Sequence, residues 1–182
     1  GYNLPFGKYK ILTVGGLSDN FRVTGKNGGR LIPGETTPYE TQIALVRNSN
    51  TVSHEFPPLW IGTTQEIDYQ ANETVHPIHL IKATNLFNLV LASSDYGQET
   101  KADTNAAAYT FEIITPEGAV YGHDNSPINK ETVKYTPYSL TAGDAASGAI
   151  AEAHINTGRL LHEEEYDYRL TVCSTETGKV VW

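Results

Sequence analysis

The sequence has one cysteine, no methionine and no long hydrophobic run. Cys173 has no second cysteine to pair with, so an internal disulfide is excluded, and its apolar strand pattern predicts a small buried side chain. No stretch reaches the ~20 apolar residues of a membrane-spanning helix. A chain without methionine is expected to be a processed product or a piece of a longer protein, with any signal peptide or lipidation site outside it.

Basic residues are also scarce, because 13 lysines and arginines face 21 acidic residues and give a net charge of -8. No basic stripe is present to displace counterions from a phosphate backbone, so a nucleic-acid partner is excluded. The sequence also lacks a Gly-x-Ser-x-Gly elbow, a His-Glu-x-x-His pair and a phosphate-binding glycine loop. The usual signatures of hydrolases, metalloproteases and nucleotide-binding enzymes are therefore missing.

Two histidine-containing segments could suggest a metal site. His76 and His79 are three residues apart, which places them on opposite faces of a strand, and the intervening proline excludes a regular helix. The run from His123 to Asn125 is rich in oxygen ligands, yet a calcium loop needs more of them at fixed spacing. An Asx-type turn is the simpler interpretation.

Glu112 and Glu117 are two carboxylates near one turn, but nothing in the pattern directs them to a common cleft, so a glycosidase pair is unsupported. We therefore predict a protein that is not an enzyme, with no catalytic residues, no cofactor and no metal. β-Rich domains of this kind usually bind, assemble or support other molecules.

The clearest structural pattern is the run from Ala108 to Thr115, in which aromatic and β-branched residues alternate. A period of two predicts a strand. The following Pro116-Glu117-Gly118 predicts a tight turn, and the residues 119–121 are expected to begin the return strand of a hairpin. We expect this strand at the centre of a sheet.

Further strands are expected at 7–14, 41–46, 65–69, 132–135, 149–155, 166–172 and 179–182, and within 75–92, where residues 82–85 mark a bulge or bend. Residues 18–39 and 141–148 are expected to be loops, and Trp60 a core residue. Tyrosine, threonine and asparagine are plentiful and no helical period is convincing. We predict one all-β domain over residues 1–182, a Greek-key β-sandwich. The expected core residues are Ile11, Phe87, Leu89, Phe111, Ile113, Leu170 and Val172.

Five segments together resemble one protein family. Residues 5–17 resemble its opening Pro-x-Gly-x-Tyr strand with a closing Gly-Leu, and residues 58–62 its Pro-Leu-aromatic-x-Gly element. Residues 78–91 resemble a strand of the pattern Leu-x-Arg-x-Thr-x-x-Ile-x-Val, with Lys82 where arginine is usual.

The second half of the chain continues the resemblance in the same order. Residues 109–138 are similar to the block Ile-x-Asp-x-Asn-Gly, Tyr-x-x-x-Asn, Tyr-x-Pro. Residues 156–160 and 168–172 are similar to its Thr-x-Arg-Leu and Arg-Leu-x-Ile ending. Each motif is weak alone, but five in order are moderately specific.

This family comprises the fimbrillin-associated anchoring subunits of fimbriae of Gram-negative anaerobes, which are outer-membrane lipoproteins at the base of the fimbrial shaft. The resemblance implies a transthyretin-like β-sandwich as the N-terminal domain of a longer chain, whose first strands and following domain lie outside these residues. It implies a cell-surface location and a role in cell adhesion. It also implies other fimbrial subunits as partners, joined by strand addition, and attachment to the outer membrane through a lipid.

Two alternatives remain open. One is a tip or stalk subunit of the same fimbriae. The other is a carbohydrate-binding β-sandwich module, for which Trp60 and Tyr121 would have to face solvent. Residues 18–39 are expected to form the most variable surface.

Overall fold

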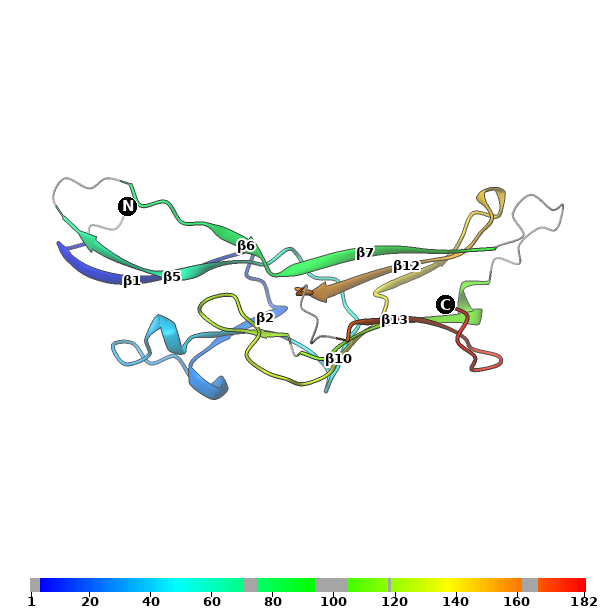
Figure 1. Cartoon of the computed structure of the whole chain (residues 1–182), viewed down its shortest axis with the longest axis horizontal. Helices are drawn as coiled ribbons and strands as arrows, with labels where there is room; N and C mark the ends of the chain where they lie inside the picture. Colours follow the sequence, from blue (N-terminus) through cyan, green and yellow to red (C-terminus); the bar gives the residue numbers. More distant parts are fainter. Residues whose placement is uncertain (1–3, 71–74, 94–104, 118, 162–166) are drawn as a thin grey trace. The chain divides into compact units, whose positions relative to one another are not determined.

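The computed structural model describes residues 4–70, 75–93, 105–117, 119–161 and 167–182, which form strands, loops and four short 3-10 turns (Figure 1). Across these described ranges there is no α-helix, so the all-β prediction is confirmed. No helix in the same ranges is long and apolar enough to cross a membrane.

The chain divides into two compact units. Unit 1 consists of Gly1–Val46, Pro57–Ala83 and Ala119–Lys130, and unit 2 consists of Arg47–Phe56, Thr84–Gly118 and Glu131–Trp182. The prediction of a single domain over residues 1–182 stays a prediction.

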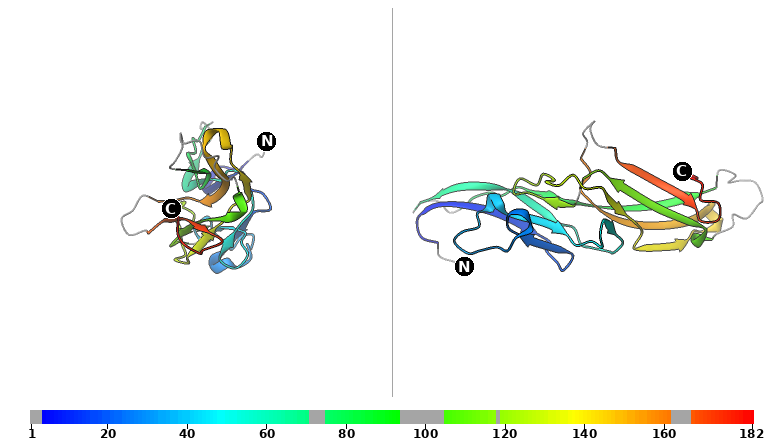
Figure 2. Two further views of the ribbon diagram at one scale, coloured as in Figure 1. Left: turned by 90° about the vertical axis from the view of Figure 1, so that its right-hand side faces the viewer. Right: turned by 90° about the horizontal axis from the view of Figure 1, so that it is seen from below.

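Unit 1 contains two three-stranded antiparallel sheets. One has the order β1 (Gly7–Gly15), β5 (Trp60–Tyr69), β6 (Leu80–Lys82), and the other β2 (Phe21–Thr24), β3 (Gln42–Leu45), β9 (Val120–Tyr121). Figure 2 shows β1 running beside β5, as their antiparallel register requires. The turns η1 (Lys26–Gly28) and η2 (Pro38–Glu40) lie between β2 and β3. The core of this unit includes the large buried apolar side chains Phe21, Ile43, Leu45, Leu59, Ile61 and Tyr121, together with the buried polar Asn125.

Gly16 fixes the end of β1. Its φ of +81° is a left-handed conformation that side chains rarely adopt, and a Cβ atom placed there would lie 2.0 Å from the carbonyl oxygen of Pro58. Only glycine fits this close approach. The expected strand at 7–14 is confirmed, and its closing glycine pair has a steric reason.

Unit 2 contains a four-stranded and a three-stranded sheet, which lie in separate layers in Figure 1. The first has the order β13 (Arg169–Ser174), β8 (Tyr109–Thr115), β10 (Val133–Tyr135), β4 (Thr51–Val52), with β10 and β4 parallel. The second has the order β11 (Ser139–Ala142), β12 (Ala149–Gly158), β7 (Thr84–Ala92). Two further turns are η3 (Ala106–Ala108) and η4 (Ala145–Ser147).

The inner faces of these sheets supply the core of unit 2. Alternate residues of β8 and β12 are buried, as a strand that covers a core on one face requires. Tyr135 is almost fully buried, and burial raises the pKa of its hydroxyl to about 12. The strand β8 pairs with β13 on one side and β10 on the other, so its predicted central position is confirmed.

The predicted hairpin after β8 is wrong. The return strand β9 pairs with β3 in unit 1, and β8 pairs with neighbours in unit 2. Thr115 Oγ1 donates to the Glu117 carbonyl at 2.9 Å, so the segment after β8 is locally closed without a return strand beside it. Gly118, the glycine of the predicted turn, lies outside the described residues.

Several element boundaries also differ from expectation. The strand β2 lies inside the expected loop 18–39, and β11 overlaps the expected loop 141–148. The break expected at residues 82–85 is present as the interval between β6 and β7, where Ala83 N donates to the Leu59 carbonyl at 2.8 Å.

Candidate subunit-docking site

The strand β7 is an open sheet edge. Among the described residues it pairs with β12 and with no other strand. Its nine residues contain no charge and no proline, the two devices that commonly protect an exposed edge from another chain. The strand β1 is equally long but carries Lys8 and Lys10. In the part of the chain that the structure describes, β7 is therefore the long edge best suited to pairing.

Both faces of β7 are apolar. Leu86 and Val90 point outward and are 52% and 59% exposed. Phe87, Leu89 and Leu91 alternate with them and are half-buried on the inner side. A closed core would bury such residues completely, so the inner face of β7 is only partly covered.

The space beside this inner face is a hollow of about 380 Å³ within unit 2. Leu89 and Leu91 line one side of it, and Phe111, Leu170 and Val172 line the side formed by the four-stranded sheet. The facing residues of β12 are small, because Ala151 pairs with Leu91 and Ala153 with Leu89. Alanines at these positions leave volume that larger side chains would occupy.

Trp182 also lines this hollow. The end of the chain pairs with β13, since Val172 N donates to the Trp182 carbonyl at 2.8 Å and Ser174 N to the Lys179 carbonyl at 2.9 Å. Gly178 makes the turn with a φ of +66°. The chain turns at Gly178 as predicted, but residues 179–182 form no strand: they contact β13 through an isolated bridge between Cys173 and Val180 and these backbone hydrogen bonds.

The expected core residues fall into two groups. Phe111, Ile113 and Val172 are buried, as predicted. The half-buried ones are Ile11, Phe87, Leu89 and Leu170. Alternation identifies an inward-facing side chain, but it does not show whether anything covers that side chain. Cys173, predicted to be buried, is also only half-buried, because it alternates with the inward-facing Val172.

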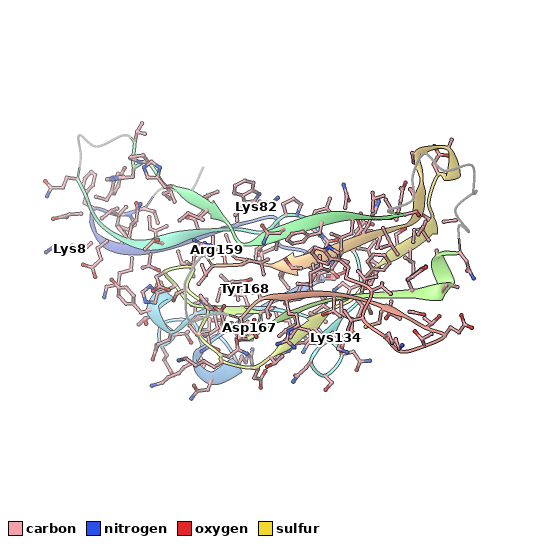
Figure 3. The ribbon with its side chains drawn as sticks, turned by 45° about the vertical axis from the view of Figure 1, so that its right-hand side comes forward. Lys8, Lys82, Lys134, Arg159, Asp167 and Tyr168 are labelled. Atoms are coloured by element: carbon pink, nitrogen blue, oxygen red, sulfur yellow. The ribbon has the colours of Figure 1, made fainter. Side chains whose placement is uncertain are left out.

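The carboxylates considered as a catalytic pair have separate partners. Glu112 accepts a hydrogen bond from Lys134 Nζ at 2.7 Å, and Lys134 is labelled in Figure 3. Glu117 is buried and accepts a hydrogen bond from the Tyr168 hydroxyl at 2.5 Å. Each of these two hydrogen bonds joins two segments of unit 2, so each carboxylate has a structural role there.

Both histidine segments lie outside the strands of unit 1. His76 and His79 lie in the chain before β6. Asp124 accepts hydrogen bonds from the backbone N–H and the hydroxyl of Ser126, an Asx-type arrangement that lowers the pKa of its carboxyl. Within the described ranges, no three histidine, cysteine or acidic side chains cluster as metal ligands.

The two aromatic residues that the carbohydrate-binding alternative requires at the surface differ in their exposure to solvent. Trp60 is 39% exposed, so its prediction as a core residue is wrong: its side chain lies over Gly15, on the opposite face of β5 from the buried Ile61. Tyr121 is only 3% exposed and belongs to the core of unit 1. One of the two rings therefore faces solvent.

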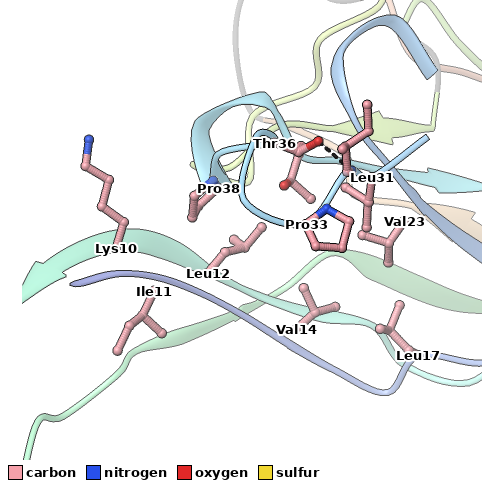
Figure 4. Close-up of a pocket in the computed structure, with 12 residues that line it drawn as sticks. Lys10, Ile11, Leu12, Val14, Leu17, Val23, Leu31, Pro33, Thr36 and Pro38 are labelled. Carbon is pink, nitrogen blue, oxygen red and sulfur yellow. Dashed lines mark hydrogen bonds between the residues drawn. The ribbon is translucent and has the colours of Figure 1, made fainter. Parts of the chain in front are cut away.

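Unit 1 has a hollow of its own, with a volume of about 640 Å³ (Figure 4). Leu12 and Val14 of β1 and Val23 of β2 line it from the strands. The loop between β2 and β3 contributes Leu31 and Pro33 on the opposite side. This loop was predicted only to be a variable surface, although its aliphatic pair Leu31 and Ile32, between glycines and a proline, is a visible signal of a lining role.

Comparison with known proteins identifies relatives of this chain. The model of the family described as fimbrillin-A associated anchor proteins Mfa1 and Mfa2 matches residues 2–182. No curated protein sequence matches the chain. A candidate adhesin from Bacteroides ovatus is 39% identical, with a TM-score of 0.86 over 98% of this chain and 56% of that structure.

Two further structures are more distant. A candidate polysaccharide-binding protein from Bacteroides thetaiotaomicron is 27% identical, with a TM-score of 0.78 over 99% of this chain and 59% of that structure. The fimbrial anchor protein Mfa2 from Porphyromonas gingivalis is 16% identical, with a TM-score of 0.66 over 98% of this chain and 60% of that structure, a likeness of fold.

The chain thus spans less than two thirds of these structures. The family match covers almost every residue and agrees with the resemblance found in the motifs. The family is a structural kind associated with fimbriae, not an enzymatic one. The chain belongs to the family of fimbrillin-A associated anchor proteins.

Proposed function

We propose that this chain is part of the anchoring subunit at the base of a fimbrium, and that it accepts a strand of the neighbouring subunit along β7. The observation that carries the proposal is the uncharged β7 edge beside an apolar hollow. Family membership supports a fimbrial role, and the edge supports the way in which the next subunit binds.

Strand addition explains both features of β7. An unpaired edge presents a row of backbone N–H and C=O groups that another strand can satisfy. The side chains of the added strand would alternate, so every second one would point toward Leu89 and Leu91. Each Leu-sized side chain that enters the hollow contributes about 1.5–3 kcal/mol through burial. The backbone thus supplies affinity, and the hollow selects apolar residues at alternate positions.

The membrane attachment is the second part of the proposal. The resemblance implies a lipid on a segment outside these residues, and a single acyl chain gives only weak binding to a bilayer. A base subunit therefore needs a second contact with the membrane or a second chain. Cell adhesion would follow from holding the shaft on the cell surface.

The test is a charge placed on the edge. Val90→Lys adds a cation to the exposed edge strand β7, at a residue that also borders the hollow, and Leu140→Lys is the matched control on β11, the other edge of the same sheet. The tagged chain is expressed in cells that make the fimbriae, and copurification of the shaft subunit is measured. We expect Val90→Lys to lose the shaft subunit and Leu140→Lys to retain it.

Two results would contradict the proposal. Equal copurification with both variants would exclude β7 as the docking edge. Immunogold labelling of this subunit at the distal end or along the shaft, and not at the cell-proximal end, would replace the anchor by a tip or stalk subunit.

A further inference from the structure

The loop between β2 and β3 presents an unusual surface in unit 1. Every residue from Lys26 to Glu35 is exposed. The loop and the adjoining strand carry three cations, Arg22, Lys26 and Arg30, and the first 34 residues contain five basic residues against one acidic residue, Asp19. A chain with a net charge of -8 thus has a locally basic surface.

These cations are available for an outside partner. Lys10, which lies nearby, forms an ion pair with Glu66 at 3.3 Å and stacks over the ring of Tyr39. No described residue forms such an ion pair with Arg22, Lys26 or Arg30. Hydrogen bonds from the backbone and side chain of Thr37 lower the pKa of the Glu40 carboxyl, and the charge of Lys26 lowers it to a smaller extent. The remaining acid on the loop is Glu35, which is exposed.

Two aliphatic side chains lie directly beside the cations. Leu31 and Ile32 follow Arg30 and are 39% and 46% exposed, and both line the hollow of unit 1 (Figure 4). Their backbone is held, because Ile32 N donates to Thr36 Oγ1 at 2.8 Å and Thr36 N donates to the Ile32 carbonyl at 2.9 Å. The exposed pair is therefore displayed by a hydrogen-bonded loop.

The base of the loop is closed in the same way. Gly25 N donates to the Gly29 carbonyl at 2.7 Å, and Gly28 N donates to the Gln42 side chain at 3.2 Å. Lys26 and Arg30 consequently stand at the two ends of one small turn. This order reduces the conformational entropy that a partner would have to remove on binding.

We propose that residues 22–35 dock on an anionic bilayer surface. Leu31 and Ile32 enter the boundary between head groups and acyl chains, and Arg22, Lys26 and Arg30 contact lipid phosphates. Exposed aliphatic residues flanked by cations are the combination that binds the interface of an anionic membrane. An acidic protein face would pair with the cations but would leave the two aliphatic side chains without apolar cover.

This inference rests on the proposed anchoring role, to which the contact would add a membrane attachment made by the protein itself. The contact involves unit 1 alone, whereas the docking of the neighbouring subunit rests on β7 in unit 2. Vesicle binding can therefore be lost while copurification of the shaft subunit is retained, and the reverse, so the failures of the two proposals are distinguishable.

The experiment is cosedimentation of the 182-residue chain with vesicles of phosphatidylcholine alone or mixed with phosphatidylglycerol. We expect binding only to the mixed vesicles, and weaker binding as the salt concentration rises, because ions screen the attraction. Arg30→Glu should weaken partitioning at least about fivefold, the effect of one cation near an anionic surface. Leu31→Ser with Ile32→Ser should weaken it on the order of tenfold.

The matched control is Lys179→Glu with Val180→Ser, an adjacent basic and exposed apolar pair in unit 2. It should bind vesicles like the parent chain. A second measurement, Ile32→Trp, should show a blue-shifted emission difference on mixed vesicles, and circular dichroism checks that each variant is folded.

Several results would overturn the proposal. The proposal fails if the parent chain does not bind vesicles, or if it binds both vesicle types equally. It also fails if the unit 2 control loses as much vesicle binding as the unit 1 variants, or if the tryptophan emission of Ile32→Trp does not shift on mixed vesicles. Self-association that Arg30→Glu abolishes, without any vesicle binding, would assign the basic surface to the acidic unit of a second copy.

Discussion

Units 1 and 2 are both built from β-strands around apolar cores, but they differ in charge. Unit 1 contains seven basic and seven acidic residues, and unit 2 contains six basic and fourteen acidic residues. Unit 2 therefore accounts for the whole net charge of -8. The described residues of each unit also enclose an apolar hollow, which is bordered by a basic loop in unit 1 and by an uncharged strand edge in unit 2.

The residues at the edge of each hollow differ in chemistry, and this difference indicates the kind of partner that binds there. Cations beside exposed aliphatic side chains suit a surface of lipid phosphates. An unprotected strand edge suits a peptide backbone. We therefore infer different partners for two cavities that are both lined mainly by leucine, isoleucine and valine.

The largest change in stability is expected from a mutation in the core beside the hollow of unit 2. Phe111→Ala should lower the free energy of unfolding by about 3–5 kcal/mol, because it deletes a buried ring next to existing empty volume. Phe6→Ala in unit 1 is the control, since Phe6 is exposed and a surface change is expected to stay within about 0.5 kcal/mol. Urea denaturation measures both.

The same variant tests whether the two units form one domain. Hydrogen exchange reports each unit separately. If residues 1–182 are one cooperative domain, as predicted, Phe111→Ala should reduce amide protection in β3 and β12 together. Protection that survives in β3 while β12 exchanges would show two domains.

A second prediction concerns alkaline pH. Burial raises the pKa of Tyr135 to about 12, against about 10 in the unfolded chain. Between these values the unfolded state releases the proton and the folded state retains it. The free energy of unfolding should therefore fall as the pH rises through this range, by on the order of 2 kcal/mol.

Tyr135→Phe should remove most of this dependence, as measured by denaturation at several pH values. Tyr39→Phe in unit 1 is the matched control. A hydrogen bond to the Glu66 carboxylate raises the pKa of Tyr39, but its ring is exposed and its contribution should be much smaller. An equal loss of slope in both variants would contradict the role assigned to burial.

Much of the fold was predictable because strand alternation is a local property. The strand β8 follows from its aromatic and β-branched residues, and the end of β1 follows from its glycines. Pairing partners were not predictable in this way. The strand β9 has two residues, too few to encode a partner, and it joins β3 instead of β8.

The candidate sites were only partly visible for a similar reason. Leu89 was recognised as inward-facing, but its cover depends on segments distant in the sequence: Phe111 of β8 and Leu170 and Val172 of β13 line the same hollow. The basic loop was missed because the net charge averages over two units of unlike charge. Charge counted in windows would have revealed it.

The smallest change in stability is expected from a mutation that fills the hollow of unit 2. Leu170 is half-buried on its wall, and Leu170→Phe adds volume where empty space exists. Such cavity filling typically stabilises a protein by about 0.5–2 kcal/mol, and we expect the lower end because the hollow is open on one side. The added ring would also occupy the space proposed for side chains of the neighbouring subunit.

Leu170→Phe should therefore raise the midpoint of thermal unfolding slightly and weaken copurification of the shaft subunit. Leu140→Phe, which enlarges an exposed side chain outside the hollow, should change neither. Stabilisation with undiminished binding would mean that the partner does not use the hollow. The two interpretations of the hollow predict different results for Leu170→Phe. A docking site predicts higher stability with weaker binding, whereas an incompletely packed core predicts higher stability with unchanged binding.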